Sequence, residues 1–274
     1  MSDHRLDHLA YADVVRRESE RVLTVLAGVD PAARVPACDG WTAADLVWHL
    51  GEVQHSWVHA VTTGTELEEM PARPAPEALA EHTAVAGTAL AQALASRAPG
   101  DPSWSWHEEG GTVGWVARRQ AHEALIHRVD AEQTAGTEVT PPPVALAVDG
   151  VDEVLRVMVD GVPGWGTFTP DGVTVRLVCT DADAGWVLAL GRFRGTGPES
   201  GTEYDLDAAA VSDAGSGGTD PTGGGGAPAD AVVRGSAWDL DRWLWGRADA
   251  SALEVEGSPA VLTRVRELVT EATQ

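Results

Sequence analysis

The sequence predicts a bundle of four helices followed by a small α+β domain. Apolar residues recur with a period close to 3.6 through the first half, as in amphipathic helices. Three consecutive prolines, residues 141–143, then interrupt this pattern. Short β-like runs alternate with helical segments after them. The expected domain boundaries are therefore residues 1–140 for the helical bundle and residues 141–274 for the α+β domain.

Each expected helix of the first half has one apolar stripe. The first covers about residues 6–27, and a loop with two prolines follows. The second runs to about residue 62 and begins at Thr42, because Thr42 and Asp45 have the spacing of a capping box. An Ala-rich helix is expected at residues 76–97, and a fourth helix at residues 113–135. Short and moderate connections between such helices favour an antiparallel bundle.

The second half has a mixed pattern. A helix is expected at residues 144–159, strands at 173–179 and 186–190, a strand at 231–234, a helix at 238–245, a strand at 253–256 and a closing helix from Pro259. Glycine dominates a segment at about residues 213–230, which is expected to form a disordered loop.

Composition excludes several classes of function. The formal net charge of -23 argues against binding to nucleic acid or to anionic membrane surfaces, because both need basic patches. The sequence has neither a long apolar run nor a signal peptide, so a cytoplasmic location is expected. Cys38 and Cys179 are far apart, which argues against a disulfide or a cysteine-based metal site. A monomer or weak dimer is expected.

Three side chains on two of the expected helices are candidates for a metal site. His49 lies on the flank of the apolar stripe of the second helix. On the fourth helix, Glu123 and His127 are four residues apart, so their side chains lie on one face. Two imidazoles and one carboxylate match catalytic zinc sites, which keep one coordination position open. The alternative is a buried network of hydrogen bonds.

Two other histidine patterns do not predict a site. His55 and His59 are also four residues apart, but they lie roughly opposite the apolar stripe and should face solvent. The pair His122 and Glu123 begins like the zinc-protease motif HExxH. The next histidine, His127, comes one residue too late for that motif, which excludes the protease interpretation.

Three segments resemble a known family. GWTAADLVWHLG (residues 40–51) resembles the second helix of the DinB-like superfamily. RRQAHEALIHRVDAE (residues 118–132) resembles the fourth helix of one of its branches, the mycothiol-dependent maleylpyruvate isomerase family of actinobacteria. WDLDRWLWGR (residues 238–247) is similar to the second domain of that family, which is sterol-carrier-like. The resemblance covers nearly the whole chain apart from the Gly-rich segment.

The resemblance implies a function. It implies that the metal ligands of the family correspond to His49, Glu123 and His127, and that the metal is a divalent cation, expected to be Zn²⁺. It also implies mycothiol as cosubstrate, bound to the metal as a thiolate that adds to a small electrophile, in an isomerase or a thiol transferase. Arg247 and Arg242 are candidate catalytic residues because a guanidinium binds carboxylates well, although they also suit a solvated helix end. Asp130 would either orient a ligating imidazole or form a surface ion pair.

Two other functions remain open from the sequence. A bound metal that activates water would make the protein a hydrolase or amidase of thiol conjugates. A non-catalytic protein would instead hold an apolar ligand in the C-terminal domain. In each case the expected partners are small molecules, with neither nucleic acid nor membrane among them.

Overall fold

The computed structural model describes residues 4–108, 110–160, 163–198, 200–214 and 229–273, and these form two compact units. The helical unit comprises Leu6–Thr140, and the α+β unit comprises Pro141–Gln274 with Met1–Arg5. Most of the segment predicted to be a Gly-rich loop lies outside the described residues. No helix in the described ranges is long and apolar enough to cross a membrane.

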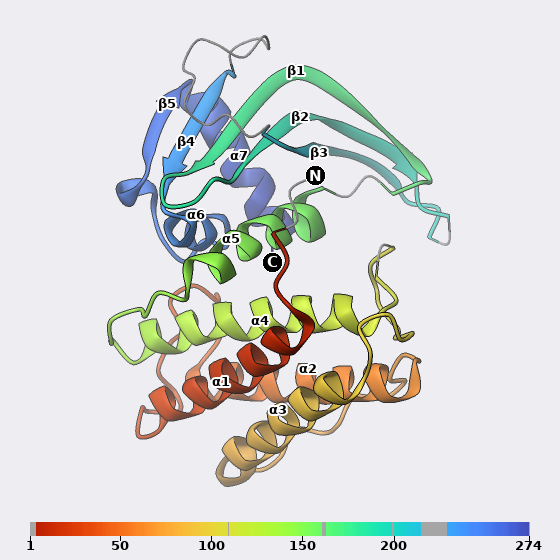
Figure 1. Cartoon of the computed structure of the whole chain (residues 1–274), viewed down its shortest axis with the longest axis vertical. Helices are drawn as coiled ribbons and strands as arrows, with labels where there is room; N and C mark the ends of the chain where they lie inside the picture. The colour runs from red at the N-terminus through yellow and green to blue at the C-terminus, as the bar shows by residue number, and fades with distance from the viewer. Residues whose placement is uncertain (1–3, 109, 161–162, 199, 215–228, 274) are drawn as a thin grey trace. The chain divides into compact units, whose positions relative to one another are not determined.

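Four α-helices build the described part of the helical unit, as the periodicity predicts (Figure 1). They are α1 (His8–Leu26), α2 (Ala43–Thr63), α3 (Leu79–Ser96) and α4 (Val113–Thr134), with a short 3-10 turn, η1 (Pro76–Ala78), before α3. Helix α4 packs against α1 and α2, and α3 packs against the same two helices. Leucines from three of these helices, Leu50, Leu90 and Leu125, are almost completely buried in the core. Burial of these apolar stripes brings α2 and α4 together.

Helix α2 begins at the predicted capping box. The backbone N–H of Asp45 donates to Thr42 Oγ1 over 3.3 Å, and the backbone N–H of Thr42 donates to Asp45 Oδ2 over 2.9 Å. The first bond adds to the one from the Asp45 N–H to the Thr42 carbonyl, and the second gives the Thr42 N–H a side-chain acceptor. The helix ends at Gly64, whose φ of 78° is the left-handed conformation common after helices. Local sequence thus determines where α2 starts and which face carries His49.

Loss of the Thr42 cap is expected to destabilise the first turn of α2. Thr42→Ala removes the side-chain acceptor and should lower the free energy of unfolding by about 0.5–2 kcal/mol. Thr42→Ser keeps the hydroxyl and should have a much smaller effect. Equilibrium unfolding in denaturant measures both variants. Equal stability of the alanine and serine variants would show that the cap contributes little.

The described part of the α+β unit contains a mixed five-stranded sheet (Figure 1). Its strands are β1 (Gly166–Cys179), β2 (Gly185–Thr196), β3 (Glu203–Asp213), β4 (Ala231–Gly235) and β5 (Glu254–Gly257), in the order β3-β2-β1-β4-β5. Of the strand pairs within the described residues, β1–β4 is parallel and the other three are antiparallel. Three α-helices accompany the sheet: α5 (Val144–Glu153), α6 (Ala237–Leu244) and α7 (Pro259–Ala272). A π-helical turn, η2 (Val154–Val159), follows α5, and a 3-10 turn, η3 (Ala250–Ala252), precedes β5.

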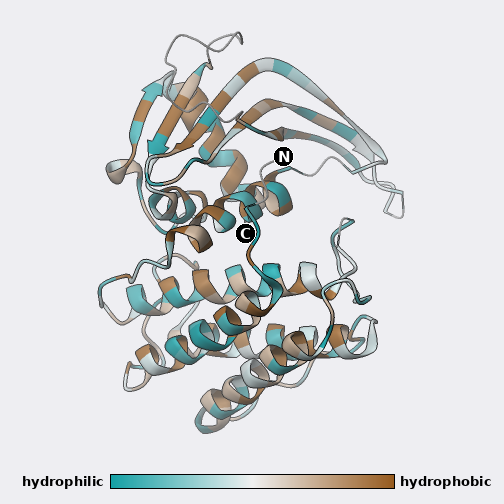
Figure 2. Ribbon diagram, viewed as in Figure 1, coloured by the Kyte–Doolittle hydropathy of each residue, from teal (hydrophilic) through white to brown (hydrophobic). Residues whose placement is uncertain are grey.

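This unit has the predicted mixed class but differs in detail. Strands β1 and β2 extend well beyond the predicted runs, and β3 was not predicted. Along most of β2 and all of β4, buried and less buried residues alternate. Figure 2 shows hydrophobic and hydrophilic residues mixed along the strands of the sheet. Strand β3 lies at the sheet edge, where Arg192 of β2 pairs with Asp205 at 2.7 Å and with Asp207 at 3.3 Å. Residues 203–208 of β3 alternate between charged and apolar side chains, which was a usable signal for this strand. The ion pairs from Arg192 add to its pairing with β2.

Candidate metal centre

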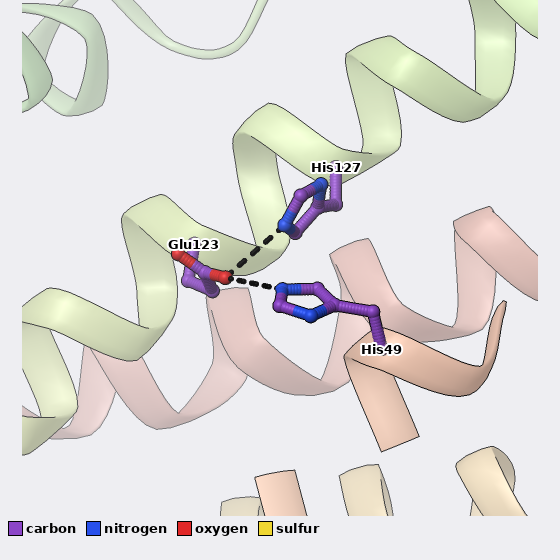
Figure 3. Close-up of side chains that lie close together, drawn as sticks. All are labelled: His49, Glu123 and His127. Carbon is purple, nitrogen blue, oxygen red and sulfur yellow. Dashed lines mark hydrogen bonds and ion pairs between the residues drawn. The ribbon is translucent and has the colours of Figure 1, made fainter. Parts of the chain in front are cut away.

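His49 on α2 and Glu123 and His127 on α4 converge at one point in the helical unit (Figure 3). One ligand atom from each lies within 4.8 Å of the other two. Glu123 Oε1 is 3.3 Å from His49 Nε2 and 3.1 Å from His127 Nε2. Among the described residues, this is the one group of three or more histidine, cysteine, aspartate or glutamate side chains with such spacing.

These distances fit a shared divalent ion. Around a tetrahedral ion with bonds of about 2.0–2.1 Å, neighbouring ligand atoms lie roughly 3.3 Å apart. The two distances from Glu123 Oε1, 3.1 and 3.3 Å, match that spacing. The donor set of two imidazole nitrogens and one carboxylate oxygen also suits zinc. Without an ion, the same oxygen accepts hydrogen bonds from the two rings.

Arg119 holds the other oxygen of the Glu123 carboxylate. It lies one turn before Glu123 on α4, is buried, and donates from Nη2 to Glu123 Oε2 over 2.6 Å. Burial by itself would raise the pKa of Glu123. The charge of His127, the hydrogen bonds from His127 and His49, and the charge of Arg119 outweigh burial and lower this pKa well below its ordinary value. Glu123 is therefore an anion, with Oε1 directed at the two imidazoles.

Asp130 binds the far side of the His127 ring. His127 Nδ1 lies 2.9 Å from Asp130 Oδ2, while Nε2 faces Glu123. Burial favours the neutral ring, but the Glu123 charge and the bonds to Asp130 and Glu123 prevail and raise the pKa of His127 to about 9. Without a metal, the His127 ring is therefore a charged imidazolium at neutral pH, with a proton on each nitrogen. Of the two roles open from the sequence, Asp130 has the contact of an imidazole partner.

The three side chains differ in burial. His127 is 7% exposed, whereas Glu123 is 17% and His49 26% exposed. Trp41, directly before α2, covers both rings: its centroid is 4.7 Å from that of His49 and 6.1 Å from that of His127. A catalytic metal needs a position that a small molecule can reach, and the partial exposure of His49 and Glu123 is compatible with one.

The histidines set aside in the sequence lie apart from this group. His55 is exposed, and its ring lies 6.2 Å from that of His82. His59 Nε2 is 3.1 Å from Thr65 Oγ1. His122 is buried, and its ring approaches Tyr11 at 6.4 Å. None of them belongs to the group formed by His49, Glu123 and His127.

Arg242 and Arg247, the candidate catalytic residues, belong to the α+β unit. Arg242 donates to Asp239 over 2.7 Å, and its guanidinium lies 5.5 Å from the centroid of the Trp238 ring. Arg247 donates to the backbone carbonyl of Trp245 over 2.7 Å. Both are half-buried rather than fully solvated. Their role in catalysis remains a prediction.

Sequence reasoning missed two contributors to the centre. Arg119 was not singled out, although its spacing of four residues before Glu123 is that of a helical ion pair. Trp41 lies in the segment that resembles the family's second helix, but no local pattern predicts that its ring covers two imidazoles. Helical spacing was therefore a usable signal for Arg119, whereas Trp41 required the tertiary structure.

Comparisons with known proteins agree with the resemblance of the sequence. A family model described as "Mycothiol maleylpyruvate isomerase N-terminal domain" matches residues 13–132, and one described as "MDMPI C-terminal domain" matches residues 145–264. Among curated proteins, none matches the sequence.

Two crystal structures have a similar fold. One is of the mycothiol-dependent maleylpyruvate isomerase with a histidine replaced by alanine; it has 17% identity and a TM-score of 0.57. The other is of the mycothiol-dependent maleylpyruvate isomerase itself, with 18% identity and a TM-score of 0.52. In both comparisons the match covers 93% of this chain and 95% of the other. With one family model on each half, the chain belongs to the mycothiol-dependent maleylpyruvate isomerase family.

Proposed function

We propose that this protein is a metal-dependent and mycothiol-dependent enzyme that adds a small thiol to a small electrophile. The observation that supports this most directly is the convergence of His49, Glu123 and His127. These residues would hold one divalent cation, in our proposal Zn²⁺. When bound, the cation would supply Lewis acidity that converts a coordinated thiol to its thiolate at neutral pH.

The protein's own residues would prepare this position. The charge of His127, the hydrogen bonds from both rings and the charge of Arg119 keep the Glu123 carboxylate ionised. The hydrogen bond from Arg119 holds Oε2, so that Oε1 faces the two rings. Asp130 holds the Nδ1 side of His127, so that Nε2 is the nitrogen directed at Glu123. Trp41 packs against both rings and limits the approach of water on that side. Together these contacts orient the three ligands before a substrate arrives.

The nucleophile in this proposal comes from the cosubstrate. Cys179 is buried, and burial together with the nearby Asp181 charge raises the pKa of its thiol to about 12. It therefore remains a protonated and unreactive thiol at neutral pH. Cys38 contacts Asp130, with 3.6 Å between Sγ and Oδ2. Neither cysteine is placed as a reactive thiolate, which favours an external thiol such as mycothiol.

Family membership favours two outcomes of the addition. In an isomerase, the thiolate adds to a conjugated double bond, the resulting single bond rotates, and the thiolate leaves again. In a mycothiol S-transferase, the new carbon–sulfur bond remains in the product. We further propose that residues 1–140 form the metal-binding domain and that residues 141–274 contribute Arg242 and Arg247 to binding an acidic substrate.

Metal analysis and a thiol-dependence assay test this proposal. We expect about one divalent metal per purified chain, and turnover of maleylpyruvate or of a thiol-reactive electrophile only when mycothiol is added. Metal-dependent hydrolysis of thiol conjugates without free mycothiol would instead show a hydrolase. A chain that binds no metal and turns over no electrophile would overturn the proposal and favour a binding protein.

A further inference from the structure

Asp130 contacts one of the proposed metal ligands, His127, on the side of the ring that faces away from the other two ligands. It is completely buried on α4, three residues after His127. A buried carboxylate is costly unless it is hydrogen-bonded. Its Oδ2 lies 2.9 Å from His127 Nδ1 and 3.6 Å from Cys38 Sγ. The same oxygen therefore contacts one of the ligands and the loop before α2.

That loop has a defined shape. The backbone N–H of Trp41 donates to the carbonyl of Cys38, and the N–H of Val35 donates to the carbonyl of Trp41, both over 3.1 Å. Gly40 between them has a φ of 81°, in the left-handed region that favours glycine. Val35 is buried in the core of the helical unit, and Cys38 and Trp41 pack against the same core. The loop is thus anchored where it places a thiol beside Asp130 and an indole over two imidazoles.

The two nitrogens of His127 have different partners, and this determines which one can bind metal. Asp130 on Nδ1 requires a proton there, because a carboxylate only accepts hydrogen bonds. When an ion displaces the other ring proton, the lone pair is therefore on Nε2, which faces Glu123 Oε1 at 3.1 Å. A carboxylate behind a ligating imidazole also increases the basicity of the ligand.

We propose that Asp130 is the positioning residue of the metal centre, fixing His127 with Nε2 toward the ion, and that the loop at residues 35–41 supports it through the Cys38 thiol. This inference rests on the proposed metal site but adds a residue and a loop that do not themselves bind the ion. It predicts that changes at Asp130 alter metal affinity, and that changes at Glu132, the other completely buried carboxylate of α4, do not.

Asp130→Asn is the direct test, and Glu132→Gln is its matched control. Both substitutions neutralise a completely buried carboxylate on α4. Glu132 pairs with Arg128 at 2.7 Å and with Arg21 at 3.1 Å, away from the three ligands. We expect Asp130→Asn to weaken zinc binding, measured by competition with a chromophoric chelator, by about 10–100-fold. Glu132→Gln should bind zinc like the parent, even where it lowers stability.

The thiol has its own pair of variants. Cys38→Ser keeps a hydrogen-bond donor for Asp130, whereas Cys38→Ala removes it. We expect parental zinc affinity for the serine variant and a several-fold loss for the alanine variant, smaller than for Asp130→Asn because a thiol is a weak donor. Equal affinity of the serine and alanine variants would remove the loop's thiol from the proposal.

A measurement on the unsubstituted protein covers the case that Asp130→Asn does not fold. Long-range nitrogen–proton NMR spectra of the zinc-loaded parent should show His127 protonated at Nδ1 and coordinated through Nε2. Coordination through Nδ1, or parental affinity in a folded Asp130→Asn variant, would overturn the inference and leave the metal site intact. A parent that binds no zinc would overturn the proposed function and this inference together.

Discussion

Replacing His49, Glu123 or His127 by alanine is expected to abolish stoichiometric metal binding. Each residue supplies one of the ligand atoms that lie within 4.8 Å of one another. Loss of a direct ligand should weaken binding by more than the roughly 10–100-fold typical of an outer residue. Metal content after dialysis should therefore fall from about one per chain to near zero, and mycothiol-dependent turnover should fall with it.

His55→Ala is the matched control, because His55 is an exposed histidine on the same helix as His49 and lies outside the group. It should retain full metal content and activity. Glu123→Ala should also be less stable than His49→Ala, since its carboxylate neutralises the buried Arg119 and His127. Full metal content in all three ligand variants would show that the metal binds at another site and would refute the proposed centre.

Metal binding is expected to strengthen as pH rises toward about 9. The pKa of His127 is raised from 6.5 to about 9, because the carboxylates around it outweigh its burial. An incoming ion must displace the proton from Nε2, so proton and metal compete. Apparent affinity should change about tenfold per pH unit below this pKa, or roughly a hundredfold between pH 9 and pH 7. Zinc titrations against a chelator across this range measure the slope.

The stability of the metal-free protein should change in the opposite direction. The folded protein binds the His127 proton more tightly than the unfolded chain does, and this raises the free energy of unfolding. The stabilisation is fully present below about pH 6.5. It is lost as pH rises through about 9. His127→Gln should flatten this part of the stability profile, whereas His55→Gln should preserve it. A metal affinity independent of pH would show that Nε2 of His127 carries no proton in the metal-free protein.

Much of the helical unit follows from local sequence. The capping box of Thr42 and Asp45 places the start of α2, because both partners lie within one turn of the chain. Glu123 and His127 share a face in any α-helix that contains them, because a spacing of four residues is close to one turn. The sequence by itself therefore determined the helices, their buried faces and the composition of the candidate ligand set.

Contacts between distant segments required the tertiary structure. The 3.3 Å approach of His49 to Glu123 depends on how α2 and α4 pack, and helical period predicts a direction but not a distance between helices. Cys38 and Trp41 reach Asp130 and the imidazoles from a loop without periodicity. The register in which β3 pairs with β2, from Glu203 opposite Thr196 to Asp213 opposite Trp186, is likewise decided only in the assembled sheet. Backbone geometry relates residues within a segment, whereas only packing relates residues in different segments.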